Sequence, residues 1–440
     1  MIRWRRALFL ATATLLAGRV GLGCASQGGA SGTLPAGQGD DASVDAAPSD
    51  PDANDVDALV DAAVDADADA APTCSTDGWC YTTLPTADSF EAGAGSSGGP
   101  APLFVMTSVW ASSDHQAWAV TAGGHVLRWD GATWKVVTVV QGSLRSIWGT
   151  SNADLWIAGD GPLVLHGTVT AGQLTLTQVP IDTYQGLKTI WGTSPSNIWV
   201  LGSSGAVFHL ETVPDAGPDP VFVPVDLPSD YPGSYNPFQA TSLWGLGNDV
   251  WIAGTDMTYC DPVDCQYVSE LVVRKWKGGN AGESSWDRVR LPMAAASAIE
   301  MYSNISVGTA TSDGVQLAFV SNGSSSDGHV VRIATSDGQL DAGAGGIHHD
   351  GVYSWTVETL KNYVGPQAIW ATDSKNAWLA GPGGVRHYDG TTWQIGRVSI
   401  TPGTPLLKDL HSIQGAVAPP SGPDMWAVGD DVALHRTVTP

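Results

Sequence analysis

The 440-residue chain carries 20 Lys and Arg against 44 Asp and Glu, which gives a formal net charge of −24 at pH 7. Proteins that bind nucleic acid gain most of their affinity from Lys and Arg side chains that displace counterions, so this balance excludes a nucleic-acid partner. Only 15% of the residues are charged and 53 are Gly, a composition that suits many short strands joined by tight turns.

Residues 1–23 have the three-part pattern of an export signal. Three arginines precede an apolar stretch at 7–18, and small residues follow at 21–25. The apolar stretch is too short to span a bilayer, which takes about 20 apolar residues. We therefore expect a cleaved signal peptide and an exported protein.

Cys24 is a candidate for lipidation. The segment around it, Val-Gly-Leu-Gly-Cys-Ala, resembles a bacterial lipobox, in which the Cys becomes the new N-terminus and carries a lipid. A lipobox prefers Leu three residues before the Cys, whereas Gly21 stands there and Leu22 lies one position late. The resemblance implies an exported lipoprotein of the cell envelope, which we expect at the outer membrane or the cell surface, with a periplasmic location as the alternative.

The other four cysteines form two local pairs, Cys74 with Cys80 and Cys260 with Cys265. Turn-forming residues separate the members of each pair, which favours local disulfides in an oxidising compartment. Cys24 is then the odd cysteine, which lipidation explains. A zinc site is the alternative, but neither pair has the two-residue spacing of a zinc knuckle.

Residues 24–73 form an acidic segment after the predicted cleavage point. From residue 26 to residue 73 there are eleven Asp and no Lys, Arg or aromatic residue. Such a segment cannot bury enough apolar surface to offset the entropy lost on ordering, so we expect a disordered tether extended by charge repulsion.

From residue 74 to residue 440 the chain repeats a Trp-rich unit. A first motif, Ser/Thr/Ala-x-Trp, is followed seven or eight residues later by a second motif, Trp-x-x-Gly or a close variant. Eleven Trp occupy these positions: Trp110, Trp118, Trp148, Trp156, Trp191, Trp199, Trp244, Trp251, Trp370, Trp378 and Trp426. Each unit reads as four antiparallel strands, and its third and fourth strands can join at a hairpin such as Asp130-Gly131.

Four-stranded units of about 40 residues cannot cover both faces alone, so they are expected to stack into a β-propeller. Seven units can be counted, with six or eight blades as the alternatives. The fifth, at 299–360, lacks both Trp, and the seventh lacks its outer strand. The segment from Trp79 resembles that missing strand, so we predict that it closes the ring.

These motifs resemble a family of Trp-rich propeller lipoproteins from myxobacteria, which carry a similar Cys-x5-Cys segment before the first blade. More distant similarity is to neuraminidase-type repeat proteins and to photosystem II assembly-factor propellers. The Asp-Gly hairpins are one residue shorter than the Asp-box of neuraminidase-type repeats. The resemblance therefore implies the fold and no particular activity.

Four histidines fall near the end of the third strand of their units: His166, His209, His387 and His435. Arg128 and Lys275 take this place in other units, so we interpret it as a solvated rim position and predict no metal site. We expect no other cofactor either.

For function, we expect a monomeric, non-catalytic binding or scaffold module with a protein or polysaccharide partner and a lipid-anchored membrane attachment. Catalytic residues are not predicted; the alternative is a propeller glycoside hydrolase or lyase, which needs paired carboxylates in the central funnel. Insertions at 213–241, 255–270 and 321–351 are candidate recognition loops. The candidate binding residues are Tyr231, Tyr235, Phe238, Tyr259 and Tyr267.

Overall fold

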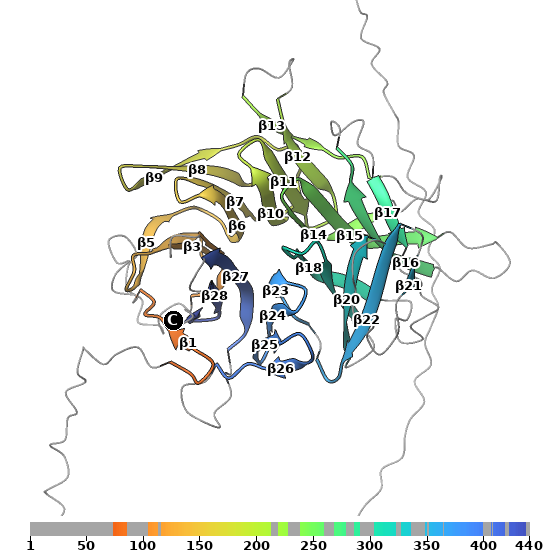
Figure 1. The fold of residues 1–440 in the computed structure, drawn as a ribbon. Helices are drawn as coiled ribbons and strands as arrows, with labels where there is room; N and C mark the ends of the chain where they lie inside the picture. The colour runs from red at the N-terminus through yellow and green to blue at the C-terminus, as the bar shows by residue number, and fades with distance from the viewer. Residues whose placement is uncertain are drawn as a thin grey trace, which may run out of the picture. The chain divides into compact units, whose positions relative to one another are not determined.

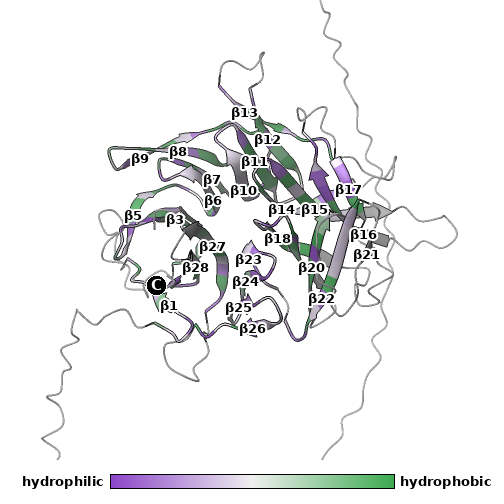
Figure 2. Ribbon diagram, viewed as in Figure 1, coloured by the Kyte–Doolittle hydropathy of each residue, from purple (hydrophilic) through white to green (hydrophobic). Residues whose placement is uncertain are grey.

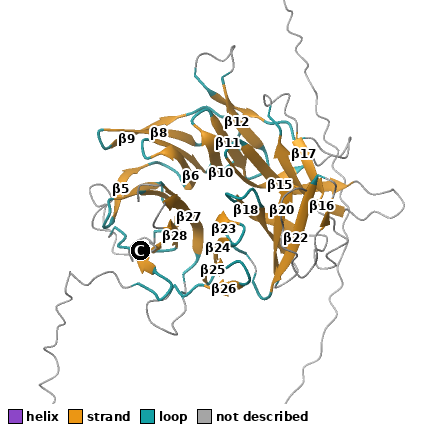
Figure 3. Cartoon of the chain, viewed as in Figure 1, coloured by secondary structure: helices purple, strands orange, loops and turns teal. Residues whose placement is uncertain are grey.

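The structure is a computed structural model, and its described residues all belong to the unit Ala68–Pro440. They are 74–85, 104–112, 116–212, 219–227, 238–258, 268–278, 286–290, 303–322, 327–335, 348–349, 352–363, 365–398, 406, 408–418 and 422–436. They form strands and loops (Figure 3). Nowhere in these ranges is there a helix long and apolar enough to cross a membrane.

Seven antiparallel sheets stand around a common centre, as Figure 1 shows, and confirm a seven-bladed propeller. The first blade is β2 (Met106–Ala111), β3 (Ala117–Thr121), β4 (His125–Trp129) and β5 (Trp134–Val139). The second is β6 (Leu144–Ser151), β7 (Asp154–Gly159), β8 (Val164–Thr170) and β9 (Gln173–Gln178). The third is β10 (Leu187–Ser194), β11 (Asn197–Gly202), β12 (Val207–Glu211) and β13 (Val221–Pro224).

The remaining blades follow the same order from the centre outwards. The fourth is β14 (Gln239–Leu246), β15 (Asp249–Thr258), β16 (Val268–Trp276) and β17 (Trp286–Arg290). The fifth is β18 (Ser303–Ala310), β19 (Gln316–Asn322), β20 (Gly328–Thr335) and β22 (Tyr353–Leu360), with β21 (His348–His349) paired outside β22. The sixth is β23 (Ala368–Asp373), β24 (Asn376–Gly381), β25 (Gly384–Tyr388) and β26 (Trp393–Ile395).

The seventh blade joins the two ends of the propeller. It contains β27 (Leu410–Ala418), β28 (Gly422–Gly429) and β29 (Val432–Arg436), and its outer strand is β1 (Trp79–Tyr81), which pairs antiparallel with β29. Trp79 is 1% exposed and packs into the core between the sixth and seventh blades. The predicted closure by this segment is therefore confirmed.

A disulfide joins Cys74 to Cys80, as expected. Because Cys80 lies in β1, the bond ties the closing strand to the chain just before it. The predicted pair of Cys260 and Cys265 lies outside the described residues, as does Cys24.

The cores of the blades are built from the middle strands, which are buried on both faces. Alternate residues of β11 and β12 pack toward the second and the fourth blade, and both strands are coloured hydrophobic in Figure 2. Outer strands have one exposed face and read as more polar; β17, with the sequence Trp-Asp-Arg-Val-Arg, is coloured largely hydrophilic there. Side-chain burial thus decreases from the middle strands to the outer strand of a blade. Stacking around an axis requires this decrease, because the inner and middle strands contact neighbouring blades on both faces.

The second Trp of each repeat lies directly across from the cationic or imidazole position on the third strand. His166, His209, His387 and His435 stack on Trp156, Trp199, Trp378 and Trp426, with ring centroids 4.3, 4.2, 4.6 and 4.0 Å apart. Arg128 and Lys275 lie over Trp118 and Trp251, at 5.3 and 5.5 Å from the ring centroids.

A polar residue two positions before each of these Trp binds the stacked group. Nε2 of His209 lies 2.9 Å from Oδ1 of Asn197, and Nζ of Lys275 lies 2.9 Å from Oδ2 of Asp249. The sequence predicted a solvated or rim position, and most of these groups are half-buried beside their Trp, whereas His209 is buried. The position accepts His, Arg or Lys because each of these side chains can lie over an indole face and reach the side-chain oxygen of the residue two positions before the Trp.

His209 makes the stability of the fold depend on pH. Burial lowers the pKa of this imidazole, outweighing the opposing effect of Glu211. Because the folded-state pKa then lies below the ordinary value near 6.5, the unfolded chain binds more protons and stability falls as pH drops below about 6.5. We expect the urea midpoint to decrease from pH 7.5 to pH 5.5, and this decrease to be smaller in His209→Gln.

Ser196→Ala is the matched control for that comparison, since Ser196 lies on the same blade and does not titrate in this range. It should retain the wild-type slope of the urea midpoint against pH. A slope in His209→Gln equal to that of the wild type would contradict the assignment.

Candidate functional site

The centre of the ring is a channel that contains two cavities. The first has a volume of about 660 Å³ and is lined by the beginnings of the inner strands of all seven blades. The second has a volume of about 460 Å³ and is lined by the later parts of the same strands. We call the first cavity the mouth and the second the floor.

Hydroxyl groups from six blades line the mouth. They belong to Thr107, Ser108, Ser146, Thr189, Ser203, Thr241, Ser242, Ser306 and Ser412. Some of them bind backbone amides of the next blade: the amide of Ile147 donates to Ser108 at 3.2 Å, that of Ile190 to Ser146 at 3.1 Å, and that of Val109 to Ser412 at 3.2 Å. The last bond crosses the junction between the seventh and first blades.

Backbone carbonyls on the inner edge are also bound by neighbouring blades. Thr107 donates to the carbonyl of Leu144 at 2.8 Å, and Thr241 donates to that of Ile305 at 2.8 Å. At these positions a side-chain hydroxyl of one blade is hydrogen-bonded to a backbone carbonyl of the next blade. An incoming peptide therefore finds those edge groups already paired, which disfavours strand addition there.

The charged groups at the mouth differ in how they are compensated. Arg145 binds Asp160 through two bonds of 2.8 and 2.9 Å, and this contact holds the pKa of Asp160 below its ordinary value. His411 bridges Gln367 and Asp430 at 2.6 and 2.8 Å. Each of these groups already has a polar partner.

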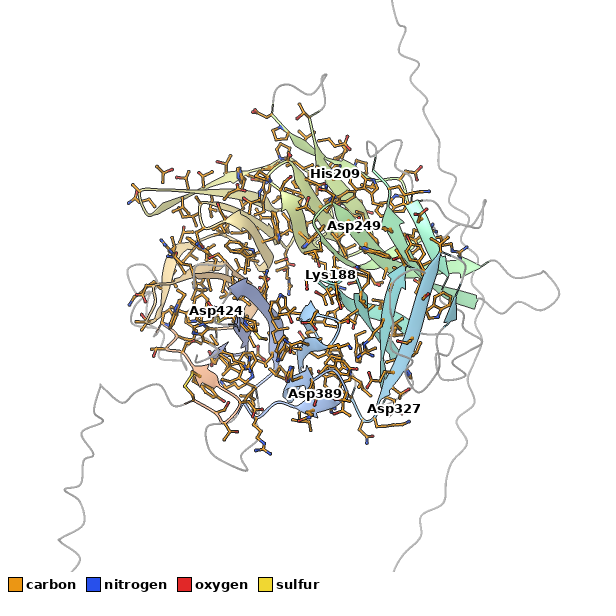
Figure 4. The ribbon with its side chains drawn as sticks, in the orientation of Figure 1. Lys188, His209, Asp249, Asp327, Asp389 and Asp424 are labelled. Carbon is orange, nitrogen blue, oxygen red and sulfur yellow. A yellow bond between two sulfur atoms is a disulfide. The ribbon has the colours of Figure 1, made fainter. Side chains whose placement is uncertain are left out.

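Lys188 is the exception among the charged groups. Its ammonium donates to the carbonyl of Thr241 at 2.6 Å, and no carboxylate of the described residues lies within ion-pair distance. The side chain reaches solvent within the cavity, yet the surrounding channel wall displaces enough water to lower the pKa of Lys188. Figure 4 places it close to the centre of the ring, whereas Asp327 and Asp389 lie at the outer edge.

The carboxylates needed for glycoside hydrolysis are not paired in the described part of the channel. Of the described residues that line the mouth and the floor, only Asp160 carries a carboxylate. Its two oxygens are engaged by Arg145, whereas hydrolysis takes two carboxyl groups on either side of a glycosidic bond. In the described ranges, no three His, Cys, Asp or Glu side chains gather as metal ligands would.

The floor has a different character from the mouth. Four indoles line it, those of Trp148, Trp191, Trp244 and Trp370. Each packs against a glycine of the following blade, so their main role is to hold neighbouring inner strands together. We therefore place the candidate site at the polar mouth.

Most of the predicted binding residues lie outside the described residues: Tyr231, Tyr235, Tyr259 and Tyr267. Phe238 is described, but it is 4% exposed and packs in the core between the third and fourth blades, with the Arg274 guanidinium 4.9 Å from its ring centroid. Its ring is not open to a ligand, because the residue begins the approach to the inner strand β14 and turns inward.

Tyr184 is a surface aromatic that sequence reasoning missed. It is 89% exposed and lies in the connection from β9 to β10, two residues before Gly186, which lines the mouth. In the sequence, Tyr184 is marked only by its position shortly before the start of a repeat. It was missed because it lies in a short connection and not in one of the long insertions.

The described strands that flank 228–237 and 259–267 also end on this side of the ring.

No protein-family model matches the chain, and no curated protein sequence matches it. Solved structures do. The chain is similar in fold to YCF48.

A structure described as YCF48 bound to D1 peptide has 17% identity and a TM-score of 0.51, and the match covers 84% of this chain and all of the other. YCF48 from Cyanidioschyzon merolae has 14% identity and a TM-score of 0.52, with 82% and 98% covered. At these identities the likeness shows the propeller fold alone, which matches the expected similarity to photosystem II assembly-factor propellers.

Proposed function

We propose that this protein is an exported, lipid-anchored propeller that binds a protein or polysaccharide partner without transforming it. The observation that carries the proposal is the channel mouth, a polar cavity of about 660 Å³ whose one carboxylate among the described residues is held by an arginine. Cavities of this size with a few fixed polar groups are typical binding sites. The structure titled YCF48 bound to D1 peptide is a precedent for ligand binding by a similar propeller.

The proposed organisation is a signal peptide at 1–23, a tether at 24–73 anchored through a lipid on Cys24, and the propeller from residue 74 onwards. Such an organisation would hold the protein in the cell envelope, in line with the resemblance to Trp-rich propeller lipoproteins. The acidic tether would hold the ring away from the membrane by charge repulsion. Partners would then bind a ring of rigid blades whose connecting loops differ in length from one blade to the next.

The direct test is to present the full-length protein, expressed in a bacterial host with its own leader, to arrays of glycans and envelope proteins. Binding and mass-spectrometric detection of cleaved glycans are measured together. We expect binding to at least one class and no cleaved product. Release of shortened glycans would contradict the proposal and favour the glycoside hydrolase or lyase instead.

The anchor is tested with the same preparation by labelling cells with an alkyne fatty acid. Cys24→Ser should lose the label and leave the membrane fraction, whereas the Ser26→Ala control should keep both. Persistence of the label in Cys24→Ser would contradict lipidation at this residue.

A further inference from the structure

We propose that the channel mouth recognises an acidic sugar, with Lys188 binding the carboxylate of a uronic acid residue. This inference rests on the proposed binding function and names its ligand class. Three features lead to it: an ammonium with no carboxylate partner among the described residues, a wall of hydroxyl groups, and an exposed aromatic ring two residues before the mouth-lining Gly186.

The ammonium of Lys188 stands apart from the other lysines of the described residues. Five of them pair with an aspartate: Lys135, Lys275, Lys277, Lys361 and Lys408. Lys188 donates to a neutral carbonyl, and the wall around it has displaced part of its hydration. An anionic ligand would supply a charge partner at a place where the channel wall has displaced part of the screening water.

The wall of the mouth suits a ligand with many hydroxyl groups. Nine Ser and Thr side chains and Gln367 line it, and a hydroxyl can both donate and accept. The hydroxyls of Ser108 and Ser412 each accept a backbone amide of the neighbouring blade, and a hydroxyl that accepts one bond can still donate another to a polar guest.

Two features favour a sugar over a peptide. The inner-edge amides and carbonyls described above are already bound by neighbouring blades, so a peptide strand cannot pair with them. Tyr184, which is 89% exposed beside the entrance, offers a ring face of the kind on which pyranose rings pack. Lys188 follows four residues later as the second residue of β10 and lines the mouth, so the exposed ring and the ammonium come from one short stretch of chain.

Arg145 does not compete for this role. Its guanidinium makes both of its described bonds to Asp160, and the pair is neutral overall. His411 is likewise held between Gln367 and Asp430. Among the described residues that line the mouth, Lys188 is therefore the one that supplies an available positive charge.

The experiment is calorimetric titration of the full-length protein with oligogalacturonate, with its methyl ester, and with an acidic peptide of similar length. The methyl ester keeps the sugar rings and removes the charge. We expect oligogalacturonate to bind, and both its esterification and Lys188→Met to weaken binding by about 10- to 100-fold, the loss of one charge-assisted hydrogen bond. Tyr184→Ala should weaken both sugar ligands together.

Lys361→Met is the matched control, since Lys361 pairs with Asp327 at the outer edge of the ring. It should bind as the wild type does. Unchanged affinity in Lys188→Met, equal affinity for the ester, or binding of the peptide alone would overturn the inference while leaving the proposed binding function intact. Cleavage of oligogalacturonate during the titration would instead overturn the proposed function.

Discussion

Replacing Trp79 with Ala should lower the free energy of unfolding by about 3–5 kcal/mol, the cost of removing a buried Trp from a packed core. Trp79 is 1% exposed and packs with Trp378 of the sixth blade and Leu434 of the seventh. The residue thus stabilises the strand that closes the ring as well as the interface between two blades. The measurement is urea unfolding followed by tryptophan fluorescence and circular dichroism.

Trp393→Ala is the matched control, because Trp393 also lies on an outer strand but is partly exposed and closes nothing. We expect it to cost clearly less than Trp79→Ala. Equal losses would contradict the conclusion that the buried ring of Trp79 stabilises the propeller more than a partly exposed Trp of another outer strand does.

The bonds around β1 explain why this junction matters. The amide of Thr82 donates to the carbonyl of Ala433 at 3.0 Å, and Arg436 donates to the carbonyl of Asp77 at 2.9 Å. Without β1, strand β29 would have an unpaired edge, which promotes association between chains. The Cys74–Cys80 disulfide closes a short loop, so its removal should cost only about 2 kcal/mol by the chain-entropy estimate.

The blade count and ring closure could be predicted because each depends on local patterns that repeat. The Asp-Gly hairpins are an example: Oδ1 of Asp130 accepts the amides of Ala132 and Thr133 at 2.9 and 2.7 Å, and Gly131 has a φ of 102°. A turn of this kind is set by adjacent residues, so the sequence reveals it.

The site was harder to predict because it is assembled by the symmetry of the ring. Lys188 and Ser306 lie far apart in the sequence and line one cavity only because their blades face the same axis. Nothing local distinguishes Lys188 from a lysine of an exposed strand. Phe238 was misjudged for a related reason: a Tyr-rich insertion surrounds it in sequence, whereas its position just before β14 turns it into the core.

A pairing rule between neighbouring blades follows from the inner strands. The first Trp of a blade lies against a glycine of the next: Trp110 against Gly149, Trp148 against Gly192, Trp191 against Gly245, Trp244 against Gly308 and Trp370 against Gly415. The fifth and seventh blades have no Trp on their inner strands. In the blades that follow them, Ala371 and Ala111 stand after the Trp in place of glycine.

This correlation shows that the glycines are there to admit an indole. The glycines are not held by backbone strain, since none of the five has a positive φ. A Cβ on Gly308 would meet three atoms of the Trp244 ring at 2.5 to 2.7 Å, closer than real contacts allow. In the two blades whose preceding blade has no Trp on its inner strand, the alanine methyl group takes the place of the hydrogen atom of glycine.

Gly308→Ala should therefore lower the free energy of unfolding by about 1–3 kcal/mol, the usual cost of overpacking a core. In a Trp244→Leu background, where the ring no longer fills the space, the same change should cost less than about 0.5 kcal/mol. The difference is a coupling energy that a double-mutant cycle measures directly by urea unfolding. Gly202→Ala is the control, because a Cβ there meets its nearest atom at an ordinary 3.4 Å. Additive losses at Gly308 and Trp244 would mean that the glycine serves some purpose other than receiving the indole, and the rule linking each blade to the next would fail.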